Sequence, residues 1–129
     1  MNRFAAVFLV AACVPHRDLP ADQIEKLDKL DKVMDVQATI ADPQFAKAGQ
    51  DSYTEADWAA FADVASRLQV TSKKAHEFSK GAEFDKLADT LHDKAAKLGT
   101  VAAARDVHAT SDALLSIKAT CKECHSKFK

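Results

Sequence analysis

The sequence predicts an all-α protein that folds as an antiparallel four-helix bundle. Gly and Pro occur only three times each among 129 residues, while Ala, Lys, Asp and Glu are abundant, which is the composition of a helical chain. Apolar residues recur at close to the 3.6-residue helical period in four long segments. Mostly short connections join these segments, so successive helices should pack side by side in opposite directions.

The chain starts with a segment that is typical of export. Met1-Asn2-Arg3 is followed by an apolar run over residues 4–12 and then by Cys13. A basic start, a short apolar stretch and small residues before a cleavage point are features of a secretory signal peptide. We therefore expect residues 1–12 to be a signal peptide, residues 13–20 to be a tether, and residues 21–129 to form one domain.

Residues 10–13, V-A-A-C, also resemble the bacterial lipobox, in which the cysteine is lipidated and becomes the new N-terminus. Under this hypothesis Cys13 anchors a periplasmic protein to a membrane; ordinary cleavage near Ala12 is the alternative. No apolar run approaches the length of a transmembrane helix. The formal net charge of −1 gives no overall field that would attract nucleic acid.

The first helix should begin with Asp22 as its N-cap, because Glu25 follows three residues later as in a capping box. It should end before Pro43, since a residue that precedes proline avoids helical angles. Residues 44–53 are then a connecting loop. The apolar stripe of this helix comprises Ile24, Leu27, Leu30, Met34, Ala38 and Ala41.

The second helix should start at the cap formed by residues 54–57, T-E-A-D, and end at Gly81 as a left-handed C′ residue. The third is expected over residues 83–98, with Gly99 as its stop and Thr100 as the cap of the fourth. The inner faces comprise Trp58, Phe61, Ala65, Leu68, Ser72, Ala75 and Ser79 in the second helix, and Phe84, Leu87, Leu91, Ala95 and Leu98 in the third.

The fourth predicted helix is the longest and carries the most specific motif of the chain. Residues 121–125, C-K-E-C-H, form the C-x-x-C-H attachment sequence of a c-type haem. Cys121 and Cys124 would each form a thioether with a haem vinyl group, and His125 would bind the iron. On a helix Cys121 and His125 share a face, because they are four residues apart. The same face carries Val101, Ala104, Val107, Leu114, Ile117 and Phe128.

Other uses of the two cysteines fit this sequence less well. A structural zinc site needs further ligands, commonly a second C-x-x-C or a spaced pair of histidines, and the sequence has neither. A redox-active C-x-x-C is typical of a βαβ context, whereas this one ends a long helical stretch. We therefore expect one covalent haem c per chain, near the C-terminal end of the fourth helix.

Four helices with C-x-x-C-H at the far C-terminal end resemble the cytochrome c′ family, also called class II c-type cytochromes. The ending C-K-E-C-H-S-K-F-K is similar to that of the family, in which an aromatic and a basic residue follow the histidine at three and four positions. The resemblance covers residues 21–129 and is most specific at the C-terminal end. It implies a haem protein, and family members are often antiparallel homodimers through their first two helices.

The resemblance implies two functions that differ in what lies across the iron from His125. Low-spin members place a methionine of the first helix there and transfer electrons, whereas high-spin members place an apolar side chain there and bind gases such as NO and CO. Met34 is the one methionine besides the initiator, so the likeness to low-spin members makes it the expected distal ligand. The alternative is that Met34 fills the core, with Leu27 and Leu30 facing the iron.

Three histidines are rival distal ligands: His76 lies near an inner face, whereas His92 and His108 lie on helix edges, where histidines are usually at the surface. An enzyme is not expected. Catalysis at the iron would need polar side chains beside it, whereas the Lys and Asp residues of the first helix fall mostly on its outer face. The predicted function is one-electron transfer in the periplasm. A high-spin, gas-binding protein with no protein sixth ligand is the alternative.

The C-terminal end is rich in lysine. From residue 118 onward, Lys118, Lys122, Lys127 and Lys129 stand against one acid, Glu123, which is a local charge of +3. We expect these lysines to form a docking face for an acidic redox partner beside the haem edge. They would otherwise complement the helix dipole or pair with haem propionates.

Overall fold

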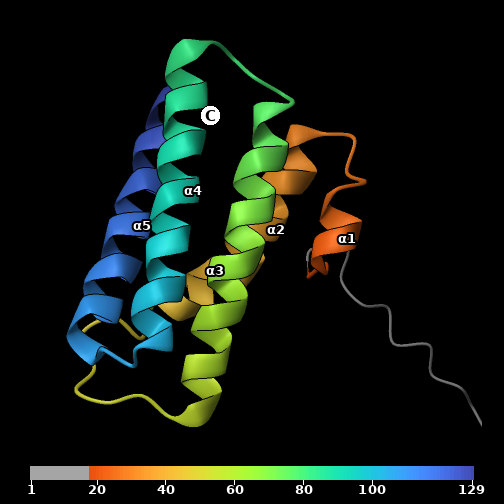
Figure 1. Cartoon of the computed structure of the whole chain (residues 1–129). Coiled ribbons are helices and arrows are strands. Elements are labelled where there is room, and N and C mark those ends of the chain that lie inside the picture. Colours follow the sequence, from red (N-terminus) through yellow and green to blue (C-terminus); the bar gives the residue numbers. More distant parts are fainter. Residues whose placement is uncertain (1–17) are drawn as a thin grey trace, which may run out of the picture.

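Residues 18–129 are described by this computed structural model, and they form five helices and no strand. The helices are α1 (Ala21–Ile24), α2 (Leu30–Phe45), α3 (Glu55–His76), α4 (Ala82–Ala103) and α5 (Val107–Phe128). The four long helices, α2 to α5, alternate in direction along the molecule (Figure 1), as expected of an antiparallel bundle. None of the helices within residues 18–129 is long and apolar enough to cross a membrane.

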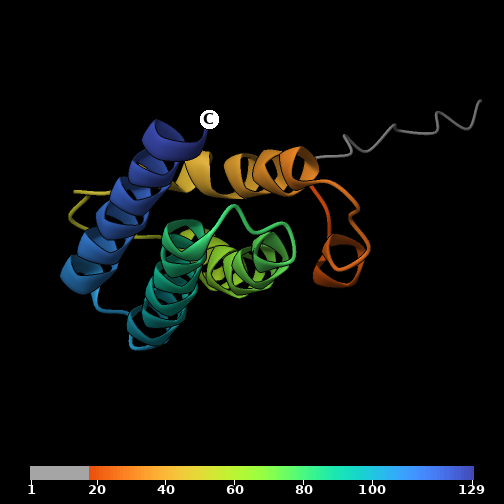
Figure 2. The ribbon, with the colours of Figure 1, turned by 90° about the horizontal axis from the view of Figure 1, so that it is seen from above.

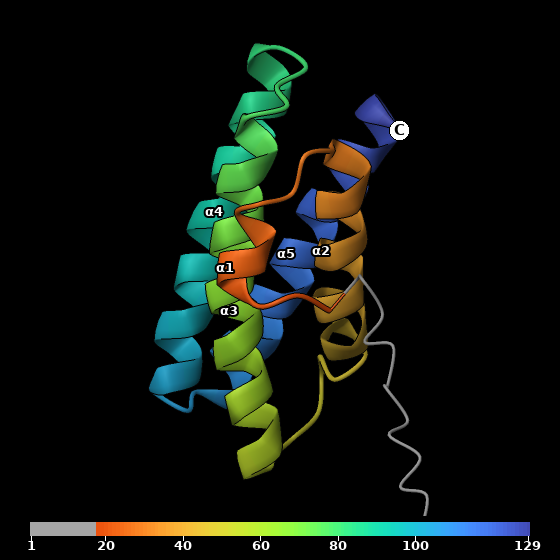
Figure 3. The same cartoon turned by 90° about the vertical axis from the view of Figure 1, so that its right-hand side faces the viewer.

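The bundle is built around α3 and α4, which pack along their length, with α5 against α4 and α2 against α3. Figure 2 shows that α2 runs across the view while α3 and α4 are seen almost end-on, so α2 is inclined to them. The last turns of α5 lie at the same height along the bundle as the N-terminal half of α2 (Figure 3), but Figure 1 shows the two segments apart.

The buried side chains form two clusters. The larger one runs through the bundle and includes the fully buried Ile24, Val36, Phe61, Leu68, Leu98, Leu114 and Ile117. The smaller one lies at the end where α5 finishes. It consists of Val33, Ala75 and Phe84, with Met34 and Cys124 among the half-buried residues packed against it.

The first predicted helix is wrong as a single element, because the chain turns over residues 25–29 and splits it into α1 and α2. Asp22 does not cap it: the N-cap is Pro20, without a side-chain hydrogen bond. The split lets Ile24 enter the larger cluster against α3 while Val33 enters the smaller one. The side chain of Arg67 also fixes the start of the described chain to α3, since it donates to Asp18 Oδ1 at 2.5 Å and to the Leu19 carbonyl at 3.2 Å.

The end and the stripe of this helix also differ from expectation. Helix α2 continues through Pro43 to Phe45, whose buried ring holds the last turn in the core. The side chains that α2 buries are Val33, Val36, Gln37, Ile40, Ala41 and Phe45. The predicted stripe is therefore rotated, and Met34 and Ala38 lie along its edge, half-buried and exposed respectively.

The cap of α3 is confirmed. The Thr54 hydroxyl accepts from the Asp57 N–H, and the Asp57 carboxylate accepts from the Thr54 N–H, which is a capping box. The predicted end is wrong, because α3 stops at His76. Gly81 does have a positive φ, +112°, but it is the N-cap of α4.

Gly99 was expected to separate the last two helices, but α4 passes through it to Ala103. The break lies at Arg105, with φ +55°, and Asp106 caps α5 by accepting from the Ala109 N–H. Thr100 is inside α4. A β-carbon built at Gly99 would lie 3.5 Å from the Ala65 β-carbon, which is an ordinary contact distance.

Gly99→Ala should therefore stabilise the protein. Alanine in a helix interior is favoured over glycine by about 0.5–1 kcal/mol, and the added methyl group meets Ala65 without a clash. We expect thermal melting followed by circular dichroism to show a rise of about 2–4 °C. A fall in melting temperature would show that the Gly99 backbone needs angles that alanine avoids, as in a helix terminator.

Candidate cofactor site

The last turns of α5 are fastened to α4 on both sides of the C-x-x-C-H motif. Before the motif, Lys94 Nζ donates to the Ser116 carbonyl at 3.1 Å and to Thr120 Oγ1 at 2.7 Å. After it, the ring of Phe128 packs edge to face on Phe84, with centroids 5.4 Å apart. The motif is thus held on α4 by contacts on both sides of it.

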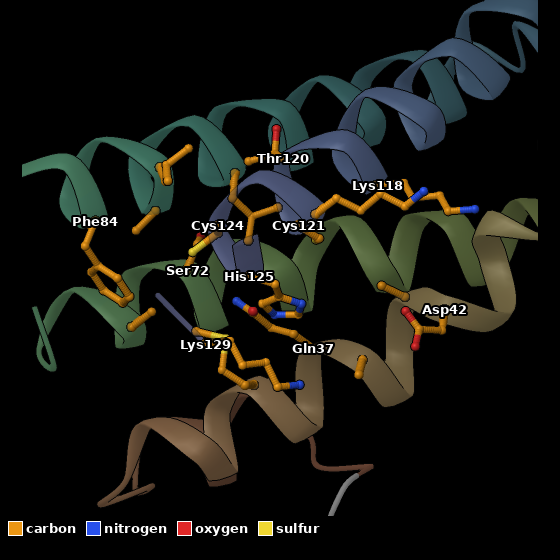
Figure 4. Close-up of a pocket in the computed structure, with 18 of the residues that line it drawn as sticks. Gln37, Asp42, Ser72, Phe84, Lys118, Thr120, Cys121, Cys124, His125 and Lys129 are labelled. Atoms are coloured by element: carbon orange, nitrogen blue, oxygen red, sulfur yellow. The ribbon is translucent and has the colours of Figure 1, made fainter. Parts of the chain in front are cut away.

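Two adjoining cavities lie between this end of α5 and α2, with volumes of about 340 and 460 Å³. Each volume is within the range of about 300–1,000 Å³ that is typical of small-molecule and cofactor sites. The residues that border both are Met34, Ala38, Phe84, Cys124, His125 and Lys129. Cys121 borders the first cavity only. Figure 4 shows the side chains that line this first cavity.

Cys121 and Cys124 are free thiols and half-buried. The pKa of Cys121 is raised to about 11, mainly by burial and also by Asp42 and Cys124. Burial, with Glu123, also raises the pKa of Cys124. A thiol with a raised pKa stays protonated at neutral pH, so both sulfurs are neutral groups on an apolar wall.

His125 is exposed on the last turns of α5, and its ring lies between α5 and α2 in Figure 4. Its imidazole has no hydrogen-bond partner among residues 18–129, so both ring nitrogens remain available. Met34 is half-buried on the opposite wall, which α2 provides, and it packs against the same small cluster as Cys124. The structure therefore brings together four of the predicted site residues: Cys121, Cys124, His125 and Met34.

The other predicted distal groups are placed differently. Leu30 borders the second cavity, but Leu27 borders neither. His76 is bound to α4 through Asp89, with Nε2 2.7 Å from Oδ1. His92 lies 3.6 Å from Asp93, and His108 is exposed at the start of α5. None of these three histidines borders either cavity. Cys13 lies outside the described residues.

The four C-terminal lysines separate into two groups. Lys118, Lys122 and Lys129 border the first cavity, and none of them forms an ion pair within residues 18–129. Lys127 instead pairs with Glu83 at 2.5 Å and with Glu123 at 3.4 Å. Lys127 therefore links α5 to α4. Three of the four predicted lysines border the cavity.

One residue of the site was missed from the sequence. Gln37 borders the first cavity from α2 and is only 8% exposed. Its Nε2 donates to Thr71 Oγ1 of α3 at 3.0 Å. The predicted stripe ran beside Gln37 through Met34, Ala38 and Ala41, and a glutamine in a helix carries no sequence signal of burial.

The residues present fit a haem c. Two neutral thiols and a free imidazole lie on the α5 wall, a thioether lies on the α2 wall, and mostly apolar side chains border the space between them. Such a donor set can attach an apolar macrocycle through two thioethers, and it includes side chains of the types that bind haem iron.

Comparison of the chain with known protein families agrees with this fit. A family model described as Cytochrome C' matches residues 21–129. No curated protein and no solved structure matches the chain. A family model that covers this much of the sequence shows the family, and the arrangement of α2 to α5 is consistent with its four-helix bundle. The chain therefore belongs to the cytochrome c′ family of covalent haem c proteins, whose members carry electrons or bind gases.

Proposed function

We propose that this protein is an electron carrier of the low-spin type, with His125 and Met34 on opposite sides of the haem iron. The observation that carries the proposal is that Met34 borders both cavities together with Cys124 and His125, from the facing helix. When bound, haem c supplies a redox centre that gains and loses one electron. Side chains of the protein attach the haem, bind its iron and exclude water.

Each of these side chains has a distinct task. Cys121 and Cys124 hold the cofactor covalently, so it remains bound in both oxidation states. His125 offers its free imidazole as the proximal ligand. Met34 offers a thioether, which favours reduced iron and raises the reduction potential relative to a second histidine. The buried apolar side chains of Ala41, Phe45 and Leu91, among others, border the first cavity and keep water away from that side of the centre.

Met34→Ala tests the proposal. In the haem-loaded ferric protein, a methionine–iron bond gives a weak charge-transfer band near the red edge of the visible spectrum. The variant should lose this band, and its ferrous form should bind carbon monoxide rapidly, because the sixth position is then open. Absorption spectra and stopped-flow mixing with carbon monoxide measure both effects.

Leu30→Ala is the matched control, since Leu30 is also half-buried on the cavity side of α2 but has no donor atom. This variant should keep the band. A native ferrous protein that already binds carbon monoxide rapidly, and whose ferric form lacks the band, would contradict the proposal. Met34 would then be a packing residue, and the protein a gas-binding member of the family.

We also propose that the lysines at the cavity form a docking site for an acidic redox partner. Lys118, Lys122 and Lys129 border the first cavity, and they have no ion pair within residues 18–129. Positive charge beside the cofactor would guide an acidic protein toward a short electron-transfer path. Lys127 is left out of the site, because Glu83 neutralises it.

Reversal of two of these charges, Lys118→Glu with Lys122→Glu, should slow bimolecular reduction by an acidic donor at low salt. It should also remove most of the salt dependence, since exposed charges are screened beyond about 10 Å at 0.1 M salt. Lys73→Glu with Lys97→Glu makes the same change in net charge outside both cavities, and should have a small effect. Equal slowing by the two pairs would indicate net charge rather than docking.

Members of the family are typically periplasmic, and we propose that Cys13 anchors this one to a membrane as a lipidated N-terminus. The V-A-A-C sequence supports the proposal. Cys13→Ser should release the protein into the soluble periplasmic fraction, as cell fractionation and immunoblotting would show. A native protein found entirely in that fraction, with another N-terminal residue by mass spectrometry, would point to ordinary cleavage.

A further inference from the structure

Among the described residues, helix α2 has one polar side-chain connection to another helix. Among residues 18–129, the hydrogen bond from Gln37 Nε2 to Thr71 Oγ1 is the only side-chain hydrogen bond or ion pair that joins α2 to another helix. Both partners are buried, with Gln37 8% and Thr71 0% exposed. The Thr71 hydroxyl donates to the Leu68 carbonyl at 3.2 Å, which leaves its oxygen free to accept from Gln37.

The remaining contacts of α2 with α3 are apolar. Val36 and Ile40 enter the larger core cluster, and Val33 enters the smaller one. Apolar packing is not directional, so these contacts alone allow α2 to rotate or slide by small amounts. A buried hydrogen bond is directional, and losing one partner leaves the other polar group unsatisfied. A single buried polar pair can therefore fix the register of two packed helices, as buried asparagines do in coiled coils.

The position of this bond relative to Met34 gives it a second consequence. Gln37 follows Met34 by three residues, so the two side chains are neighbours on the surface of α2. Both border the first cavity, across from the C-x-x-C-H motif. Gln37 and Met34 belong to the same helix, so both side chains move together when the helix turns about its axis. A rotation that broke the Gln37–Thr71 bond would therefore also displace the Met34 sulfur along the cavity wall.

We propose that Gln37 is a positioning residue for the distal side of the cofactor site. Its hydrogen bond to Thr71 fixes the rotation of α2 and thereby holds the Met34 thioether on the wall that faces His125. The inference rests on the proposed ligation by Met34. It assigns a role to a buried polar pair that an apolar pair of similar size could replace with little loss of stability.

Gln37→Leu and Thr71→Val each remove the bond, and each replaces a polar side chain by an apolar one of similar size. In the haem-loaded protein both variants should weaken the methionine–iron band and lower the reduction potential. The rate of carbon monoxide binding should rise about tenfold, the factor expected when a buried hydrogen bond no longer holds the closed arrangement. Thr71→Ser keeps the hydroxyl group, so this variant should retain the native band, reduction potential and carbon monoxide rate.

Two controls separate positioning from general loosening. Ile40→Val removes a buried methylene from the same helix interface without touching the hydrogen bond, and it should keep the native spectrum while lowering the melting temperature. Thr39→Val removes a hydroxyl of α2 that borders neither cavity and donates within its own helix, to the Asp35 carbonyl at 2.8 Å. It should keep the native band and potential. Far-UV circular dichroism verifies the helical fold of every variant.

Three outcomes would overturn the inference. If Gln37→Leu and Thr71→Val keep the native band, potential and carbon monoxide rate while Met34→Ala changes them, Met34 is a ligand that needs no such support. If Ile40→Val weakens the band as much as they do, any loosening of α2 has the same effect. If Met34→Ala changes nothing, the proposed ligation itself is wrong and the role of Gln37 falls with it.

Discussion

The structure depends on the separation of α2 from the last turns of α5. Four amphipathic helices of ordinary composition would close on one another and fill the space between them with side chains. Here α5 is held on α4 by Lys94 and by the Phe84–Phe128 pair, whereas α2 rests on α3. Each wall of the site has its own support, and α2 and α5 make few direct contacts with each other. This arrangement suits a bundle whose core includes a large apolar cofactor.

Much of the fold could be predicted from local signals. The capping box of Thr54 and Asp57 fixes the start of α3 within four residues of sequence, and the helical period of apolar residues gives the four long helices. The glycines were misleading because their effect depends on distant residues. Gly99 stays helical where α4 packs closely on Ala65, while the break falls at Arg105, a residue type that rarely adopts a positive φ. The turn over residues 25–29 likewise reflects the burial of Ile24 against α3, which the local sequence does not encode.

The site divides in the same way. The C-x-x-C-H motif is contiguous and chemically specific, so Cys121, Cys124 and His125 could be named from the sequence, and Met34 followed from the family resemblance. Gln37 and the separation of Lys127 from the other lysines could not, because both depend on pairs far apart in the chain. Thr71 lies 34 residues from Gln37, and Glu83 lies 44 residues from Lys127. Such pairs exist only once the helices have been placed.

The attachment of Asp18 and Leu19 to Arg67 has a mechanical consequence. Any pull on the N-terminal end of the chain reaches the folded domain first at this clamp, which passes it to α3 before α1 or α2 is loaded. No residue of α1 borders either cavity, and the clamp lies ahead of the turn that leads into α2. The clamp thus ties the N-terminal end of the described residues to α3, a helix that does not carry Met34. If the domain is anchored by its N-terminal end, as proposed, a force on that end acts on α3 and not on the helix that carries Met34.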